Sequence, residues 1–270
     1  MCRLKTITTT GGRPDALSLE KARFVAQQLT IECIPRKKRS VQKLAEAYQA
    51  HIIVAGKGRY EYFPYGAVEP FFFHPSSAAF RIKRLVRGEL DTFIQSANLQ
   101  AGDSLLDCTL GLATDSMIAA EVVGDTGRVV GCEANANVAF IVKQGLKEYD
   151  FEAENLPQLS RMRNIEVVSE NAVDYLKKQP DNSFDVVYLD PMFEEVIEES
   201  KNFKPLRQAG VHDEVSNEWI EQAKRVAKKR VVLKAHFRSP LFARFQFEQQ
   251  VRPNIKFHFG VIHCEEKECL

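Results

Sequence analysis

The sequence predicts an α/β protein whose larger part is a mostly parallel sheet with helices on both faces. Apolar segments of strand length alternate with amphipathic segments of helix length from about residue 100 to residue 235. The segment 184–189 is apolar enough for a strand at the centre of such a sheet. Residues 255–264 surround Gly260 with apolar residues, which predicts a terminal antiparallel hairpin.

Residues 1–88 predict a small α/β region of their own, and residues 89–270 the main domain. The N-terminal region begins with a strand that ends at Gly11 and Gly12. The periodicity predicts helices over 17–29, 41–48 and 78–87 and strands over 51–55 and 59–63. We expect Ser76 or Ser77 to cap the helix over 78–87.

Basic residues are concentrated in this N-terminal region, in one short run and on the helix over 78–87. They are Arg36, Lys37, Lys38, Arg39, Arg81, Lys83, Arg84 and Arg87. Three consecutive phenylalanines, 71–73, precede the helix and cannot all face one side of a strand. One interpretation is a surface for the phosphates and unpaired bases of RNA. The other is a solvated charged face beside a phenylalanine-rich core.

Length and composition limit the classes of function. The chain has 270 residues, of which 44% are hydrophobic and 27% charged, as in soluble globular proteins. It has no apolar run long enough for a membrane span and no apolar signal sequence, so we expect a cytoplasmic protein. Cys108 and Cys132 fall in expected strands and predict free thiols. His263, Cys264 and Cys269 lack zinc-site spacing, so we expect no metal.

A strand, a glycine turn, a helix and a second strand follow one another between Asp103 and Asn135. Gly111 in the turn allows a ligand to approach the backbone. Glu133 directly follows the second strand, where a carboxylate accepts hydrogen bonds from both ribose hydroxyls. A pyrophosphate favours a turn with more glycines than this one. The unit therefore favours a nucleoside without phosphates, such as S-adenosylmethionine (SAM), over NAD. The alternative is an ordinary strand–helix–strand unit with a glycine turn and no ligand.

The remaining segments complete the predicted sheet. We expect strands over 165–168, 184–189 and 230–235, and helices over 134–146, 172–178, 219–227 and 242–251. This order predicts a Rossmann-like, doubly wound sheet, in which ligands bind beyond the carboxyl ends of the strands. Five candidate residues fall at predicted strand ends: Asp107, Gly111, Glu133, Asn171 and Asp190.

The tetrapeptide 190–193 follows the strand over 184–189 and suits the binding of a planar amino group. The Asp190 carboxylate and the Pro191 carbonyl are acceptors for the two N–H groups, and Phe193 offers a ring on which a base can stack. The alternative is an ordinary strand end followed by a proline turn.

The segments 107–115 and 187–193 resemble class I SAM-dependent methyltransferases. They are similar to the bacterial small-subunit ribosomal RNA guanine-N2 methyltransferases of the RsmJ type, over about residues 100–270. The N-terminal third looks more like an uncharacterised bacterial branch of that superfamily. The resemblance implies that Thr114, Asp115, Glu133 and Ala134 line the cofactor site. It also implies that Asn171, with Glu170, lies near the adenine and that Asp190 lies between cofactor and substrate. Thr114 and Glu194 replace an arginine and a proline of the RsmJ type.

These observations predict an enzyme that transfers a methyl group from SAM to an exocyclic base nitrogen of RNA, with guanine N2 of ribosomal RNA first among the targets. The cofactor carries the leaving group, so the protein mainly positions the reactants. Two alternatives stay open: a methyltransferase for a small molecule or a protein, and a non-catalytic RNA-binding module with the same fold. The sequence leaves the oligomeric state open.

Overall fold

A computed structural model describes residues 4–152, 157–191 and 215–264, and they form two compact units. The described part of the smaller unit comprises residues 4–74 and 135–149; the rest belongs to the larger unit. The predicted boundary at residue 88 therefore differs from the observed division between His74 and Pro75. No described helix is long and apolar enough to span a membrane.

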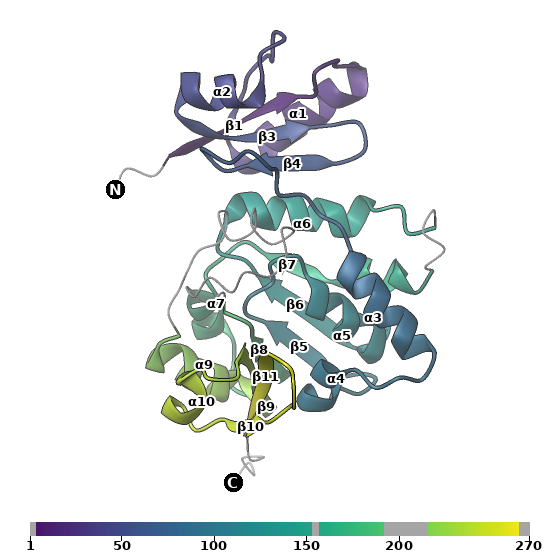
Figure 1. Cartoon of the computed structure of the whole chain (residues 1–270), viewed down its shortest axis with the longest axis vertical. Helices are drawn as coiled ribbons and strands as arrows, with labels where there is room; N and C mark the ends of the chain where they lie inside the picture. The colour runs from purple at the N-terminus through teal and green to yellow at the C-terminus, as the bar shows by residue number, and fades with distance from the viewer. Residues whose placement is uncertain (1–3, 153–156, 192–214, 265–270) are drawn as a thin grey trace. The chain divides into compact units, whose positions relative to one another are not determined.

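The smaller unit is a four-stranded sheet with the order β2-β1-β3-β4 (Figure 1). Its strands are β1 (Lys5–Thr10), β2 (Glu32–Cys33), β3 (Ala50–Ala55) and β4 (Tyr60–Phe63). Its helices are α1 (Ala16–Leu29), α2 (Val41–Tyr48) and α6 (Ala136–Glu148). Strand β1 pairs in parallel with both β2 and β3, whereas β4 is antiparallel to β3.

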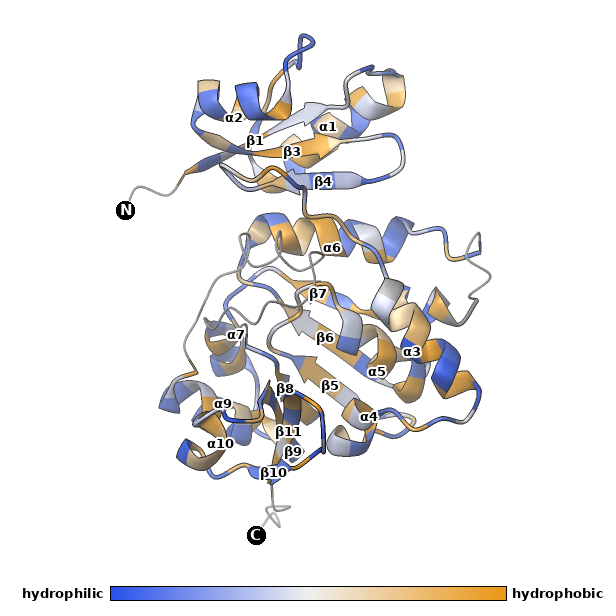
Figure 2. Ribbon diagram, in the orientation of Figure 1, coloured by the Kyte–Doolittle hydropathy of each residue, from blue (hydrophilic) through white to orange (hydrophobic). Residues whose placement is uncertain are grey.

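Helices cover both faces of this small sheet. Helix α2 buries Leu44 against Ile52 and the other apolar side chains of one face. On the opposite face, Phe140 of α6 lies with its ring 5.2 Å from Tyr60 and 6.1 Å from Phe24 of α1. Figure 2 shows β3 in orange along much of its length, whereas α2 alternates between orange and blue. The sheet therefore forms the centre of its own hydrophobic core.

The three phenylalanines belong to this smaller unit. Phe71 and Phe73 are buried, and Phe71 pairs with Tyr62 through two backbone hydrogen bonds of 2.7 Å. The ring of Phe72 lies 3.5 Å from the Arg59 guanidinium. Alternate residues thus enter the core of the unit, so the interpretation of a base-binding aromatic platform here does not fit the burial of Phe71 and Phe73.

Gly145 of α6 provides the first test of this packing. A Cβ atom at this position would lie 2.1 Å from Phe73 Cγ, a rigid part of a buried ring. Gly145→Ala is expected to lower the free energy of unfolding by about 1–3 kcal/mol, because overpacking outweighs the roughly 1 kcal/mol gain in helix propensity. Urea denaturation measures the change. Gly58→Ala, where the new methyl group meets open space, is the control and should be neutral.

The larger unit contains a seven-stranded sheet with the order β10-β11-β9-β8-β5-β6-β7 (Figure 1). Its parallel strands are β5 (Ser104–Asp107), β6 (Arg128–Cys132), β7 (Glu166–Val168), β8 (Phe184–Leu189) and β9 (Ala227–His236). Strands β10 (Glu248–Gln250) and β11 (Phe257–His263) continue it in antiparallel pairing. The predicted mostly parallel sheet with terminal antiparallel strands is confirmed.

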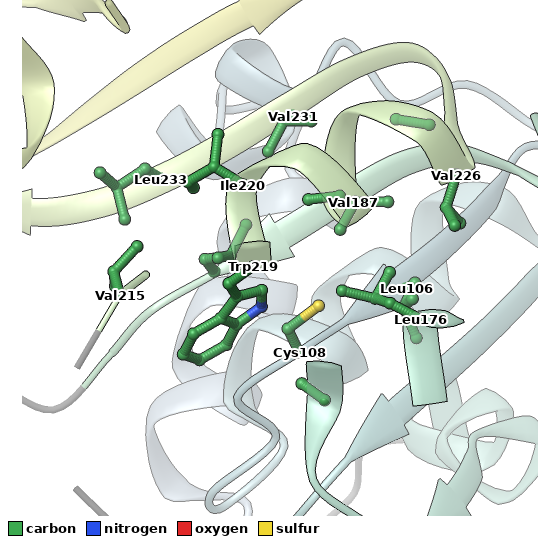
Figure 3. Close-up of a cluster of buried hydrophobic side chains, with 14 of the residues drawn as sticks. Leu106, Cys108, Leu176, Val187, Val215, Trp219, Ile220, Val226, Val231 and Leu233 are labelled. Carbon is green, nitrogen blue, oxygen red and sulfur yellow. The ribbon is translucent and has the colours of Figure 1, made fainter. Parts of the chain in front are cut away.

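The helices of the larger unit are α3 (Ser76–Val86), α4 (Thr92–Ala97), α5 (Thr114–Val123), α7 (Ala172–Lys178), α9 (Asn217–Val226) and α10 (Leu241–Arg244), with a 3-10 helix η1 (Pro157–Asn164). Pro75 occupies the N-cap position of α3, so the predicted serine cap is wrong. Figure 3 shows how Trp219 and Ile220 of α9 pack against the strand side chains Leu106, Val187 and Leu233. This cluster covers one face of β5, β8 and β9, which pair side by side.

The C-terminal segment differs from its prediction in detail. The helix expected over 242–251 is limited to α10 and is followed by β10. Gly260 lies within β11 rather than in a turn, and a Cβ atom there would come within 2.6 Å of Phe242 and 2.8 Å of Phe247. The glycine therefore allows two aromatic side chains to approach the strand closely.

Candidate active site at the carboxyl edge of the larger sheet

The candidate site lies where β5 and β8 end. From β5 the chain proceeds to β6 and β7 on one side, and it then returns to β8 on the other side of β5. Such a reversal opens a crevice beyond the carboxyl ends of the two strands. Asp107 is the last residue of β5, and Asp190 directly follows β8. The sequence placed both residues at this edge, and the structure brings them together.

Asp107 is a buried carboxyl group that is held by its neighbours. Its Oδ2 accepts a hydrogen bond of 2.6 Å from the Ser116 hydroxyl, and its Oδ1 accepts one of 2.9 Å from the Thr109 backbone N–H. Burial, together with the nearby carboxylates Asp115 and Asp190, raises the pKa of Asp107 to about 7, against the effect of these hydrogen bonds. Within the described chain, no cationic side chain forms an ion pair with Asp107.

The loop after β5 adopts two left-handed backbone positions. Gly111 has a φ of 50°, and Ala113, which precedes the first residue of α5, has a φ of 59°. The Ala113 N–H donates to the Leu110 carbonyl across the turn at 2.7 Å. A left-handed alanine is costly, so its presence shows that the surrounding fold fixes this turn.

Asp190 is linked to strand β9 and to the loop that follows β5. Its backbone N–H donates to Thr109 Oγ1 at 2.7 Å, and its Oδ2 accepts a hydrogen bond of 2.6 Å from Lys234 Nζ of β9. Burial raises the pKa of Asp190, while the ammonium group of Lys234 opposes this shift. Pro191 is buried beside it. Phe193, the predicted stacking residue, lies outside the described residues.

Asp115 joins the same cluster from the start of α5. Its oxygens accept hydrogen bonds from Arg81 at 2.5 Å, Tyr188 at 2.8 Å and Lys234 at 3.4 Å. Burial alone would raise the pKa of Asp115, but Lys234 and Arg81 outweigh it and hold the pKa well below its usual range. Two cations thus neutralise the Asp115 carboxylate, so Asp115 positions Lys234 and Arg81. Its contact with the cofactor stays a prediction.

Arg81 departs from its expected role. Its guanidinium binds both oxygens of Asp91 at 2.8 Å each and Asp115 at 2.5 Å, with 24% of the side chain exposed. Burial disfavours its charge, but the two carboxylates more than compensate and raise the pKa of Arg81. Because both carboxylates occupy the guanidinium, we remove Arg81 from the residues expected to contact RNA.

The remaining predicted site residues follow β6 and β7 or begin α5. Glu133 directly follows β6 and is half-buried, as are Ala134 and Thr114. The Asn171 side chain accepts hydrogen bonds from the Val173 and Asp174 N–H groups and thereby caps α7. Glu170 forms an ion pair with Lys178. Glu133 thus occupies the predicted strand end, whereas the side-chain oxygen of Asn171 caps α7, a structural role that was not predicted.

Lys234, the cation between Asp115 and Asp190, is the main residue of this cluster that was not predicted from the sequence. A signal was present, because it is the one charged residue in the apolar segment 231–235. A lysine in a central strand needs a carboxylate partner. Within the described ranges, the histidine, cysteine and acidic residues form no group suited to a metal ion.

Comparisons with known proteins place this geometry in context. A family model described as "Putative SAM-dependent methyltransferase" matches residues 71–256. "Uncharacterized protein YpiP" of Bacillus subtilis is 41% identical over 255 residues, which cover 94% of this chain and 98% of that protein. "Ribosomal RNA small subunit methyltransferase J" of Acinetobacter baylyi is 34% identical over 117 residues, 42% of this chain and 41% of that protein. The crystal structure of the SAM-dependent methyltransferase NGO1261 from Neisseria gonorrhoeae has the same fold, with a TM-score of 0.58, 18% identity and 96% coverage of both chains.

Proposed function

The chain belongs to the family of SAM-dependent methyltransferases, and from this premise we propose that it methylates an exocyclic base nitrogen of RNA. Guanine N2 of ribosomal RNA is the first target to test. The observation that carries the proposal is the position of Asp190 and Pro191 beyond β8, with the Asp190 carboxylate held by Lys234 at 2.6 Å. The relative from Acinetobacter baylyi, named for ribosomal RNA methylation, supports the choice of RNA.

The described residues fit a positively charged nucleoside cofactor. The cluster has four carboxyl groups and two cations: Asp91, Asp107, Asp115, Asp190, Arg81 and Lys234. Bound SAM supplies a transferable methyl group on a cationic sulfur, together with an ammonium group. We assign Asp107, which lacks a cationic partner in the described chain, to the cationic part of the cofactor. We assign Glu133 to the ribose hydroxyls.

In the proposed reaction, the chain orients the attacking nitrogen. One Asp190 oxygen and the Pro191 carbonyl accept the two N–H groups of the base, so its lone pair points at the methyl carbon. Bound SAM would supply the methyl group, and its sulfur would keep the electrons of the broken carbon–sulfur bond, which would leave the attacking nitrogen positively charged. Asp190 stabilises that charge and accepts the released proton. Lys234 binds the other Asp190 oxygen and is a positioning residue.

One face of α3 supports the choice of RNA as the substrate. Phe80, Lys83 and Arg84 occur at helical spacing, so they share one side of α3, and Arg87 follows as its C-cap residue. All four are exposed, with Phe80 64% exposed. Arg84 also forms an exposed ion pair with Glu89 at 2.7 Å. Arg81, by contrast, points into the cluster with Asp115. Cations beside an exposed ring suit contacts with RNA phosphates and an unstacked base.

Arg87→Gln tests this face through salt dependence. The loss of one phosphate contact is expected to reduce the slope of log affinity against log salt by about 1, without changing thermal stability. Fluorescence anisotropy with a labelled ribosomal RNA fragment measures the slope. Lys177→Gln, an exposed lysine on α7 paired with Glu218, is the control. Equal slopes for Arg87→Gln and wild type would remove Arg87 from the RNA-binding surface.

The raised pKa of Asp107 predicts a pH dependence of cofactor binding. A cationic ligand binds the ionised carboxylate, and the pKa of Asp107 without ligand is about 7. Affinity for SAM is therefore expected to rise about tenfold from pH 6 to pH 8, because the ionised fraction rises from about 0.1 to about 0.9. Calorimetry across this range measures the change. The Asp107→Asn variant should bind SAM more weakly and lose this part of the pH dependence. A pH profile of SAM affinity equal to that of wild type would contradict the assignment of Asp107 to the cofactor.

The direct test of the proposed function is a transfer assay. The purified protein is incubated with SAM labelled in the methyl group and with either deproteinised small-subunit RNA or assembled small subunits. Nucleoside digestion and mass spectrometry then identify the product. N2-methylguanosine supports the proposal in full, and another N-methylated base supports RNA with a different target. If the RNA takes up no label, and in a cell extract only small molecules or protein do, a small molecule or a protein would replace RNA as the proposed substrate.

A further inference from the structure

The smaller unit contains a cavity that the proposed methyl transfer does not use. It has a volume of about 540 Å³ and is lined by Gly11, Gly12, Arg36, Val54, Gly56, Lys57, Gly58, Arg59 and Glu61. All of these residues belong to the smaller unit. We propose that this cavity is a phosphate-binding site, in addition to the SAM site of the larger unit.

The topology of the smaller sheet places the cavity where α/β proteins bind ligands. The chain passes from β1 to β2 on one side and then to β3 on the other side of β1, so its direction reverses between β1 and β3. A crevice opens at such a reversal, beyond the carboxyl ends of the strands. Gly11 and Gly12 follow β1, and Gly56 follows β3, so the cavity lies at this reversal point.

The charge of the loops is uneven between the two ends of the sheet. The three loops after β1, β2 and β3 span residues 11–15, 34–40 and 56–59. They carry seven cations and one carboxylate: Arg13, Arg36, Lys37, Lys38, Arg39, Lys57, Arg59 and Asp15. The loops that enter β2 and β3 from the helices, residues 30–31 and 49, carry no charge. Positive charge is thus concentrated at the end with the cavity, which favours an anion.

Arg36 is the fixed cation of the site. Its Nη1 donates to the carbonyl of Thr10, the last residue of β1, at 3.1 Å, and its Nε donates to the Arg39 carbonyl at 3.0 Å. Within the described chain, no carboxylate forms an ion pair with Arg36, so its charge remains available to a ligand. A guanidinium that is already oriented loses little freedom when it binds a phosphate.

The other two cations that line the cavity, Lys57 and Arg59, are paired with carboxylates that a phosphate would have to replace. Lys57 lies 3.2 Å from Asp15, and Arg59 lies 2.7 Å from Glu61. Both cations have largely exposed side chains, with 73% and 51% exposure, so these pairs are weak. The glycines complete the site, because a Cβ at Gly11, Gly12 or Gly58 would meet only open space. A ligand can therefore approach the backbone at Gly12 and Gly58 closely, whereas the Gly11 N–H already donates to the Ala55 carbonyl at 3.2 Å.

Two variants separate this site from general electrostatic attraction. Gly12→Val keeps every charge and fills part of the cavity, and Lys57→Gln removes one cation. Calorimetric titrations of the whole protein use inorganic pyrophosphate, ATP and a short single-stranded RNA. Each variant is expected to weaken binding about tenfold or more while the melting temperature stays unchanged. Lys224→Gln, an exposed lysine on α9, is the control and should bind as wild type does.

The three probes also distinguish the source of the phosphate. Binding of RNA that pyrophosphate displaces, and that both variants weaken, identifies a phosphodiester of RNA. Binding of ATP that both variants weaken, without binding of RNA, identifies a free nucleotide and supports the site equally. Wild-type affinity of both variants for all three probes, or no binding of any probe by wild type, would overturn the proposal. Methyl transfer can fail or succeed independently of these results.

Discussion

Asp190→Asn is expected to lower the rate of methyl transfer by about 10²–10⁴-fold. The substitution keeps the size of the side chain but removes the negative charge that stabilises the developing positive charge on the nitrogen. It also removes the group that accepts the proton. Single-turnover transfer from labelled SAM to RNA measures the rate. Affinity for S-adenosylhomocysteine should stay within a few-fold of wild type, because we assign cofactor binding to Asp107 and Glu133.

Asp174→Asn is the matched control for this experiment. Asp174 is an exposed carboxylate on α7, and its loss should leave transfer unchanged. A rate for Asp190→Asn equal to that of wild type would remove Asp190 from the mechanism. Loss of both transfer and cofactor binding would instead assign Asp190 to the cofactor.

Lys234→Met is expected to lower the free energy of unfolding by about 3 kcal/mol, since the removal of one partner leaves Asp115 and Asp190 in a buried cluster with one cation fewer. The Lys234 side chain is 27% exposed, which places the cost at the lower end of the usual range. Urea denaturation measures it. The rate of methyl transfer should fall as well, because the Asp190 carboxylate loses the contact that orients it.

Lys229→Met on the same strand is the control for Lys234→Met. Lys229 also pairs with carboxylates, Asp103 at 2.6 Å and Asp185 at 3.5 Å, but 43% of its side chain is exposed. Its loss should cost less than that of Lys234, about 1 kcal/mol, because solvent screens this more exposed ammonium group even though Asp103 is buried. The double variant Lys234→Met with Asp190→Asn should lose less stability than the sum of the two single variants. Equal costs for Lys234→Met and Lys229→Met would contradict the buried cluster.

The sequence predicted best those features that depend on nearby residues. Helix α7 and strand β8 have the bounds that the apolar periodicity indicated, and Asp190 follows β8 as expected. Gly260 shows the opposite case. A glycine between apolar residues suggested a turn, yet its role is to make room for Phe242 and Phe247, and this contact depends on how the chain folds back.

The candidate site was predicted in part for the same reason. Parallel strands end at one edge, so residues that follow β5, β6 and β8 could be grouped from their order alone. The ion pairs could not, because Arg81 lies 34 residues from Asp115 and Lys234 lies 44 residues from Asp190 in the chain. The helix α6 likewise follows β6 in the sequence but belongs to the smaller unit.

The most direct test of the central claim is a calorimetric titration with S-adenosylhomocysteine of wild type, Glu133→Ala and Asp190→Asn, with methyl transfer to RNA measured on the same preparations. We expect saturable binding by wild type, binding weakened at least tenfold in Glu133→Ala, and binding without transfer in Asp190→Asn. Binding by Glu133→Ala equal to that of wild type, or full transfer by Asp190→Asn, would contradict the assignment of the cofactor and the reacting base to this edge of the sheet.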